Sequence, residues 1–546
     1  MSRTVKRVRG LLKEKWVPRV SAARIGLGLF TLAALTWVLA GTLGTAPRQW
    51  KEGEVAPATV YAPFPFVVQE TDRTVQVERG ELVVSRGERL SRAQVTHLKA
   101  LDQQIQAGSP PARWWGSFLL SFIFAAVGSI YLKRYEPKVW KNFRHLALLV
   151  ALLIGVLAAG RLLLASVFVS TWIPVACIPM LLGMLFPPRL GIVMGLLSTG
   201  LIGLMGPVDL PVVLSLGIGC FVGAYAVQGI RRRIHFFWAG LITGLAQGMT
   251  IVGWTLLMQQ PWEVGFSLGL AALGGGFVAG GVVTFCLLPL CEFLFALMSE
   301  VSLLELSDLN HPLLKELSVK APGTYQHSLI VAGLAEAACQ AIGANALLAR
   351  VGCYFHDIGK MLHPEYFVEN QAPKESRHER LAPSMSSLVI LNHVKDGVEL
   401  ARQRRLNPAI IDFIPGHHGT GLIYYFYRRA LEEVEDETML KEEGFRYPGP
   451  RPQTRETAVA LLADSSEAAT RSLKEKNPAR IQEVVRRIIN NKFIDGQLDE
   501  CDLTLKDLNR IGEAFLRVLA GIYHRRIEYP KTPWEEEEGQ EGRRAG

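Results

Sequence analysis

The chain has few cysteines, and their positions argue against a disulfide framework. Four of the seven lie in apolar stretches and three lie beyond residue 300, whereas the polar segment 45–112 has none. No two cysteines are spaced as Cys-x-x-Cys, so the sequence also lacks the thiolate pairs typical of structural zinc sites and redox motifs. The chemistry of this protein must therefore depend on other side chains.

Charged residues are scarce over most of the segment 21–298. Between residues 146 and 186 the only charge is Arg161, and about 20 apolar residues are enough for one helix to cross a bilayer. Hydrophobic residues make up 49% of the chain, more than a soluble protein of this length needs. The pattern therefore predicts a mostly α-helical, polytopic membrane protein that contacts the lipid bilayer.

The apolar segments predict eight spans, arranged as one followed by seven. The first lies at 21–44, and its length favours an uncleaved anchor over a cleaved signal peptide. The other seven lie near 114–132, 145–164, 166–186, 190–206, 210–230, 234–258 and 265–288. Pro289 and Glu292 predict that the last span ends close to them. Gly276 and Gly280 form a GxxxG pattern that would permit a homodimer contact.

Loop charges predict which side of the membrane each part faces. Seven Lys and Arg residues precede the first span, and the loops assigned to the same side carry nine more. The turns at 206–210 and 259–263 carry none. Because basic loops stay in the cytoplasm, the N-terminus and the region after residue 298 are predicted to lie on the cytoplasmic side of the cell (plasma) membrane.

These boundaries predict six regions. They are a basic cytoplasmic N-terminus (1–20), the first transmembrane helix (21–44), a short extracytoplasmic module (45–112), a seven-span domain (113–298), a cytoplasmic domain (299–530) and a disordered acidic tail (531–546). In the module, 81–85 predicts a strand, and Ser91 with Gln94 predicts a capping box that begins a helix. The formal net charge of +9 fits contact with an anionic membrane surface better than binding of a nucleic-acid polymer.

Side chains suited to metal binding recur in the C-terminal half, and two adjacent pairs among them are hard to explain by packing. The candidates are His327, His356, Asp357, His393, His417, His418 and Asp464. Asp357 has two oxygens and can bridge two ions, whereas a neutral imidazole offers one lone pair. Such a set fits a dinuclear centre that prepares a hydroxide for attack on phosphorus.

Each candidate also has a structural interpretation. His393 alone would be a surface histidine or a hydrogen-bonded core histidine, and Asp464 alone would cap or hydrogen-bond a helix. The joint pattern favours metal binding, because one helical domain supplies enough ligands for two ions. Three further histidines fit no ligand role and are assigned to the surface or to packing: His311, His363 and His378.

The order His…His-Asp…Asp is the signature of the HD-domain phosphohydrolases. Longer strings resemble one branch of them, among them APGTYQHSLIVAGLAEAA, FHDIGKMLHPEYFVENQ, GHHGTGLIYYFYRRA and LADSSEAATRSL. That branch is the seven-transmembrane HD (7TMR-HD type) family of membrane-bound cyclic di-AMP phosphodiesterases. The resemblance is strong over about 300–530 and covers the membrane region in outline. Family members usually carry a much larger exterior domain than 45–112, so this chain resembles a form with that domain shortened.

The resemblance implies an activity and a set of ligands. All seven candidates would bind two divalent ions, manganese or iron, with Asp357 as the bridge. A bridging hydroxide would open cyclic di-AMP and release linear pApA. The expected catalytic residues are His356, Asp357 and Lys360, whose ammonium group could hold a phosphate or remain a solvated lysine at a helix end.

Other functions stay open on the residues alone. Cyclic di-GMP relatives carry Gly-Tyr-Pro soon after their paired histidines, whereas this chain continues with Gly-Thr-Gly-Leu-Ile. Hydrolysis of another nucleotide is a second alternative. A third is a membrane receptor or transporter whose HD domain only binds nucleotide. Few ionisable residues in the spans disfavour transport, and a complete ligand set disfavours a pure receptor.

Overall fold

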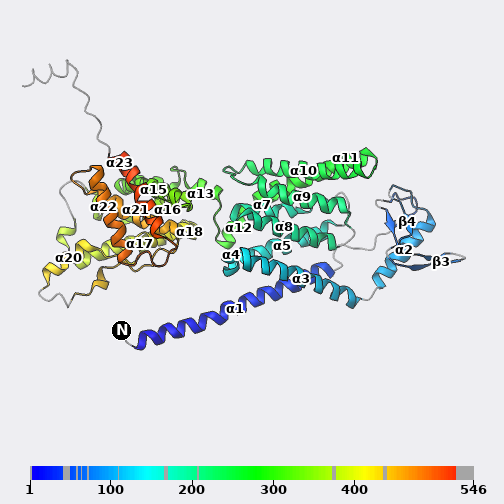
Figure 1. The fold of residues 1–546 in the computed structure, drawn as a ribbon, viewed down its shortest axis with the longest axis horizontal. Helices are drawn as coiled ribbons and strands as arrows, with labels where there is room; N and C mark the ends of the chain where they lie inside the picture. Colours follow the sequence, from blue (N-terminus) through cyan, green and yellow to red (C-terminus); the bar gives the residue numbers. More distant parts are fainter. Residues whose placement is uncertain are drawn as a thin grey trace, which may run out of the picture. The chain divides into compact units, whose positions relative to one another are not determined.

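The protein is mostly α-helical, as predicted (Figure 1). The computed structural model describes residues 3–40, 50–56, 59–62, 64–70, 73–85, 87–107, 110–164, 170–205, 208–371, 377–434 and 440–523. The chain divides into two compact units, Met1–Val301 (unit 1) and Ser302–Gly546 (unit 2). The predicted acidic tail lies outside the described residues, as do the side chains of the basic N-terminus.

Unit 1 contains the apolar helices of a multi-pass membrane protein. Within the described ranges, five apolar stretches are long enough to cross a bilayer: part of α1 (Arg3–Ala40), α3 (Pro110–Tyr135), α5 (Phe143–Leu163), α10 (His235–Leu257), and the continuous run of α11 (Trp262–Gly276), the π-helical η2 (Phe277–Val282) and α12 (Val283–Phe295). Three shorter apolar segments are Pro174–Leu185 (η1 and α7), α8 (Pro188–Leu204) and α9 (Leu210–Ala226). The short helix α4 (Pro137–Lys141) links α3 to α5. Eight spans therefore stay a prediction.

One predicted span is interrupted by a turn. The sequence predicts a helix over 166–186, but residues 171 and 172 form a turn and the helical segment after it begins at Pro174; residues 165–169 lie outside the described residues. Proline fixes φ near the helical value and needs no hydrogen-bond partner for its nitrogen, so it favours the first position of a helix. The last span passes Pro289 and ends at Phe295, three residues beyond Glu292.

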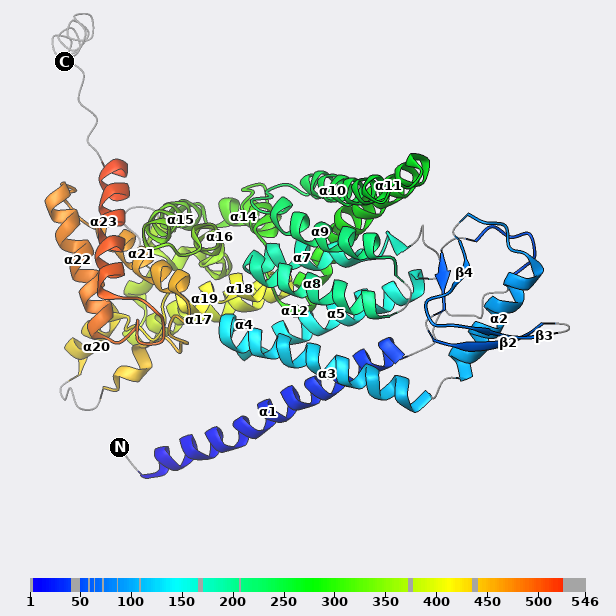
Figure 2. The ribbon, with the colours of Figure 1, turned by 45° about the vertical axis from the view of Figure 1, so that its right-hand side comes forward.

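The glycines of the predicted GxxxG pattern pack inside the chain. A Cβ on Gly276 would collide with Gly244 of α10, and one on Gly280 would lie 3.5 Å from the Cα of Gly240. Small residues let two helix backbones approach closely, and α10 and α11 lie side by side in both views (Figures 1 and 2). These glycines therefore stabilise the bundle of one chain, and the homodimer stays a prediction.

The segment predicted to be an extracytoplasmic module forms a small α/β body in unit 1. Strands β1 (Val60–Tyr61) and β4 (Leu82–Val84) pair antiparallel, as do β2 (Phe66–Glu70) and β3 (Arg73–Val77). Helix α2 (Arg92–Ala107) begins at the predicted capping box, where Ser91 N donates to Gln94 Oε1 at 2.9 Å and Gln94 N to Ser91 Oγ at 3.3 Å. That box is confirmed, whereas the β2–β3 hairpin was missed.

Unit 2 is all-helical around one long central helix. Its helices are α13 (Glu300–Leu306, which begins in unit 1), α14 (Pro312–Lys320), α15 (Pro322–Ile342), α16 (Ala346–Phe355), α17 (Pro383–Gln403), α18 (Pro408–Ile411), α19 (Phe413–Gly416), α20 (Tyr424–Glu433), α21 (Arg455–Arg471), α22 (Pro478–Ile494) and α23 (Leu505–Ile522). Short 3₁₀ turns connect α16 to α17: η3 (Ile358–Leu362), η4 (Pro364–Tyr366), η5 (Val368–Asn370) and η6 (Arg377–Arg380). Another, η8 (Glu442–Phe445), precedes α21. Helix α15 packs against α16, α21 and α23.

Helix starts in unit 2 follow local capping chemistry. Asn345 accepts from Leu348 N at 3.0 Å at the start of α16. Thr454 and Thr457 form a capping box at the start of α21. A threonine or asparagine oxygen satisfies an N–H group that the first turn of a helix leaves open. These caps fix where the helices that carry the candidate ligands begin.

Candidate metal centre

His356 and Asp357 lie where α16 ends and η3 begins. His356 is the C-terminal cap of α16, and its Nδ1 donates to the carbonyl of Cys353 at 2.7 Å. Gly359 then brings η3 against α17, because a Cβ at this position would collide with the carbonyl oxygen of His393. The close contact between these backbones places Asp357 beside the imidazole of His393.

Two other histidines are oriented in the same way. Nδ1 of His393 donates to the carbonyl of Ile390 at 2.5 Å, and Nδ1 of His417 donates to that of Phe413 at 3.1 Å. Because Nδ1 carries the proton in each ring, the lone pair is on Nε2. A backbone acceptor that fixes the tautomer and the ring orientation is typical of metal-binding histidines.

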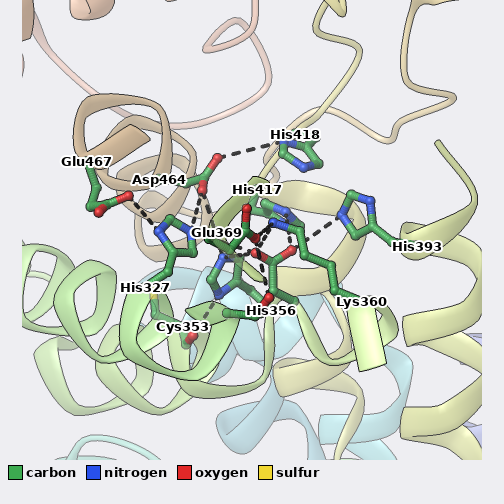
Figure 3. Close-up of polar contacts among 12 residues, drawn as sticks. His327, Cys353, His356, Lys360, Glu369, His393, His417, His418, Asp464 and Glu467 are labelled. Atoms are coloured by element: carbon green, nitrogen blue, oxygen red, sulfur yellow. Dashed lines mark hydrogen bonds and ion pairs between the residues drawn. The ribbon is translucent and has the colours of Figure 1, made fainter. Parts of the chain in front are cut away.

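The Nε2 atoms of four histidines surround Asp357, two on each carboxylate oxygen. Figure 3 shows these four histidines gathered with Lys360 and Asp464. His356 lies 3.2 Å and His327 3.7 Å from Oδ2, whereas His393 lies 3.4 Å and His417 3.5 Å from Oδ1. The two oxygens of one buried carboxylate therefore face two different pairs of imidazoles.

Asp464, on α21, extends this arrangement. Its Oδ1 lies 3.0 Å from His327 Nε2 and its Oδ2 lies 3.8 Å from His418 Nδ1. All seven predicted ligands thus gather into two groups that share Asp357, each with its ligand atoms within 4.8 Å of one another. One is Asp357, His393, His417 and His418, and the other is His327, His356, Asp357 and Asp464.

Several of these buried atoms have no hydrogen-bond partner among the described residues. They are Nε2 of His356, His393 and His417, and Oδ1 of Asp357, whereas Oδ2 of Asp357 is ion-paired with Lys360. A buried polar atom without a partner costs about 1–3 kcal/mol. Four such atoms that point toward one another fit a bound cation, and imidazole with carboxylate is a ligand set for divalent transition metals.

Charge in the centre keeps Asp357 ionised and His418 neutral, the protonation states that bind a cation. Burial alone would raise the pKa of Asp357, but His356 and Lys360 hold the pKa of its carboxyl well below the usual range. Burial and the adjacent His417 lower the pKa of His418, so this imidazole is neutral. Burial also lowers the pKa of His327, but hydrogen bonds to Asp464 and Glu467 raise it to about 9 overall.

Lys360, the third predicted catalytic residue, lies between two carboxylates. Its Nζ is 2.7 Å from Asp357 Oδ2 and 2.9 Å from Glu369 Oε1. Burial would lower the pKa of this ammonium group, but both carboxylates raise it above its ordinary value. Lys360 is therefore a charged, ion-paired lysine at the centre and not a solvated residue.

Two residues that contact the centre were missed by the sequence analysis. Glu467 Oε2 accepts from Nδ1 of His327 at 2.6 Å and is buried. It follows Asp464 by one helical turn, a spacing that could have indicated it. Tyr447 stacks on His418 with ring centroids 4.1 Å apart. It comes from the Pro-rich segment 433–455, where no periodic pattern indicated a role.

The histidines assigned to packing keep that assignment in the structure. His311 caps α14 by accepting from Leu313 N at 3.3 Å. His378 is 8% exposed, and its Nε2 lies 2.8 Å from the carbonyl of Tyr366. Neither belongs to the two ligand groups among the described residues.

An all-helical domain with this ligand set, carried by a chain with apolar helices, defines a membrane-anchored HD-type protein. Residues 111–299 match the family model described as a 7TM receptor with intracellular HD hydrolase, and residues 324–469 match the HD domain. Over both regions the chain is similar to this seven-transmembrane HD family. Unit 2 is thus a divalent-metal-binding domain.

Similar proteins include two curated relatives and one solved domain. The cyclic-di-AMP phosphodiesterase PgpH of Bacillus subtilis (strain 168) is 46% identical over 287 residues, which are 52% of this chain and 40% of that protein. PgpH of Listeria monocytogenes (strain 10403S) is 37% identical over 479 residues, 84% of this chain and 64% of that protein. This chain therefore spans less than two thirds of either relative. The crystal structure of the L. monocytogenes PgpH HD domain is 49% identical and covers 39% of this chain and 100% of that domain, with a TM-score of 0.38.

Proposed function

We propose that this chain is a membrane-bound, metal-dependent phosphodiesterase that hydrolyses cyclic di-AMP to linear pApA. The observation that carries the proposal is the carboxylate of Asp357, whose two oxygens face separate pairs of imidazoles. The names of the two relatives, both cyclic-di-AMP phosphodiesterases, support this substrate.

The seven residues of the two ligand groups would hold two divalent ions, manganese or iron, with Asp357 between them. Such ions lower the pKa of a water from 15.7 to about 7 and neutralise charge on phosphoryl oxygens during displacement. The residues of the chain then have distinct tasks. His356, His393 and His417 keep their Nε2 lone pairs free because Nδ1 is engaged by backbone carbonyls.

Other side chains position these ligands and the substrate. Glu467 orients His327, and Glu369 holds Lys360 beside Asp357. With Asp357 bound to cations, the ammonium of Lys360, still held by Glu369, would be available to a phosphoryl oxygen. The ring of Tyr447 covers one face of His418 and limits its rotation. We assign catalysis to His356, Asp357 and Lys360 on this basis.

The membrane arrangement is part of the same proposal. Basic residues before the first span and in alternate loops support a cytoplasmic N-terminus and a cytoplasmic catalytic domain at 299–530. A second messenger made inside the cell would reach the centre there. A reporter fused after Ser299 should signal the cytoplasm, and an exterior signal would overturn this orientation.

The test uses the purified full chain in detergent. The protein is stripped with a chelator, reloaded with Mn²⁺ or Fe²⁺, and assayed with cyclic di-AMP, cyclic di-GMP and cyclic AMP, with identification of the products. We expect metal-dependent formation of pApA, faster than any other product. Preference for another nucleotide would overturn the substrate. Binding of cyclic di-AMP without cleavage of any nucleotide would instead favour a receptor.

A further inference from the structure

A second lysine lies next to the turn that carries His417 and His418. Lys492 belongs to the last turn of α22, and its Nζ lies 3.3 Å from where a Cβ on Gly421 would stand. Gly421 is itself bonded to the turn, because its N–H donates to the carbonyl of His418 at 3.0 Å. The ammonium group of Lys492 is therefore beside the backbone that presents two of the proposed ligands.

The end of α22 is fixed to this turn by hydrogen bonds. Gln497 N donates to the carbonyl of Lys492 at 3.1 Å, and the side chain of Gln497 accepts from Thr420 N at 2.8 Å. Arg446 donates to the carbonyl of Thr420 at 2.9 Å. Two elements far apart in the sequence are thus held together, so the place of Lys492 beside the centre is set by the fold.

Among the described residues, no carboxylate oxygen lies within 4.0 Å of Lys492 Nζ. The neighbouring carboxylate, Asp495, is engaged by Arg446 at 3.0 and 3.2 Å and by Gln497 at 2.9 Å. Burial lowers the pKa of Lys492 below its ordinary value, although Asp464 and Asp495 act in the opposite direction.

The two lysines near the centre differ in this respect. Lys360 is neutralised by Asp357 and Glu369, whereas Lys492 is half-buried and has no carboxylate within ion-pair distance among the described residues. A partly buried ammonium group without a counter-ion favours the arrival of an anion. The contact of Lys492 with Gly421, three residues after His418, places this amine next to the turn that carries two of the proposed ligands.

We infer that Lys492 is a substrate-binding residue that contacts the second phosphate of a cyclic dinucleotide, the one not undergoing hydrolysis. This inference rests on the proposed function, because only a substrate with two phosphates can occupy both positions. It also assigns a basis for preferring cyclic dinucleotides to cyclic mononucleotides, which have one phosphate. The contact would be made in the Michaelis complex and kept through the reaction, so it would act mainly on KM.

The experiment compares Lys492→Met with the wild-type full chain on two substrates. One is cyclic di-AMP, and the other is bis(p-nitrophenyl) phosphate, which has a single phosphate and reports on the metal centre alone. We expect KM for cyclic di-AMP to rise about 10–100-fold, the worth of one hydrogen bond to a charged group, with a change in kcat of at most about threefold. The loss with bis(p-nitrophenyl) phosphate should be at most about threefold.

Two variants serve as controls. Lys492→Arg keeps the charge and should recover most of the affinity, whereas Lys506→Met removes a charge from an exposed position of α23 and should leave both substrates unaffected. Equal losses with both substrates, or an unchanged KM for cyclic di-AMP, would overturn the inference. If the wild-type chain does not cleave cyclic di-AMP, the proposed function fails. Equilibrium binding of cyclic di-AMP then decides on Lys492, and equal affinities of wild type and Lys492→Met would overturn its role.

Discussion

Some buried polar groups of unit 1 find partners in their own helix, whereas the buried ring atoms around Asp357 in unit 2 do not. In unit 1, Ser198 and Thr243 donate to carbonyls of their own helices, Met194 at 2.7 Å and Ala239 at 2.8 Å. In unit 2, the Nε2 atoms of His356, His393 and His417 are buried and have no such partner among the described residues. Burial alone therefore does not indicate function. Unpaired polar atoms that converge on one point do.

The strongest test of this contrast removes the shared carboxylate. Asp357→Ala should lower turnover of cyclic di-AMP by at least about 10³-fold, because the loss of the bridge removes several kcal/mol of charge stabilisation. The bound metal, measured by elemental analysis, should fall in parallel, while the far-ultraviolet circular dichroism stays helical. The control is Asp502→Ala at an exposed position. Near-normal turnover in Asp357→Ala would contradict the bridging role.

A smaller effect on metal binding is expected from Glu467, which is hydrogen-bonded to the proposed ligand His327. Glu467→Gln keeps the shape of the side chain but removes the charge that accepts the proton of His327 Nδ1. Loss of such an outer partner typically costs about 10–100-fold in metal affinity. Titration of the metal against a competing chelator measures this directly. Glu483→Gln, an exposed residue of α22, is the matched control. Equal metal affinities for Glu467→Gln and wild type would leave Glu467 without this role.

The sequence predicted the ligands better than their surroundings. His356 and Asp357 are adjacent and belong to a recognisable order, so their chemistry could be inferred without a fold. Glu467 acts on His327 from 140 positions away, and Lys492 reaches Gly421 only because two distant elements pack together. Such contacts depend on how helices pack, and a linear pattern does not contain that information.

The prediction of helices and strands was limited in the same way, because local sequence signals do not contain tertiary packing. Apolar runs and caps predicted most of them, including the capping box at Ser91, because these signals are local. The turn at residues 171 and 172, inside the predicted span 166–186, was missed, because an uninterrupted apolar run does not show where a turn divides it. The β2–β3 hairpin was missed, because its strands are only five residues each and its core residue Phe66 is buried by other parts of the module.

Asp495, a carboxylate bonded to Arg446 and Gln497, should have a smaller, pH-dependent effect on stability. Burial raises the pKa of Asp495, but the hydrogen bonds from Arg446 and Gln497 lower it by more. The pKa of this carboxyl therefore lies below the ordinary 3.8. A depressed pKa in the folded state means that the stabilisation is present above pH 3.8 and is lost as the pH falls through the folded pKa. Because Asp495 is 33% exposed, Asp495→Asn should cost at most about 1 kcal/mol at pH 7.

Melting curves of the full chain from pH 7 to pH 3 measure this difference. The gap between wild type and Asp495→Asn should stay constant down to about pH 4 and close below it. A gap that persists unchanged at pH 3 would mean that the ion pair with Arg446 is not its cause. Asp495 belongs to neither ligand group and is bonded to Arg446 and Gln497, so its removal should not change the metal content.

The smallest effect is expected in the membrane unit. Ser198 is fully buried in α8, yet its hydroxyl bonds only to the carbonyl of Met194 one turn earlier. That carbonyl also accepts the helical N–H, so Ser198→Ala leaves no polar atom without a partner and should change stability by less than about 1 kcal/mol. Melting of the detergent-solubilised chain, with metal content as a second readout, tests this. A large loss of stability would show that a hydroxyl bonded within its own helix can still be essential, and the contrast between the two units would then fail as a guide to function.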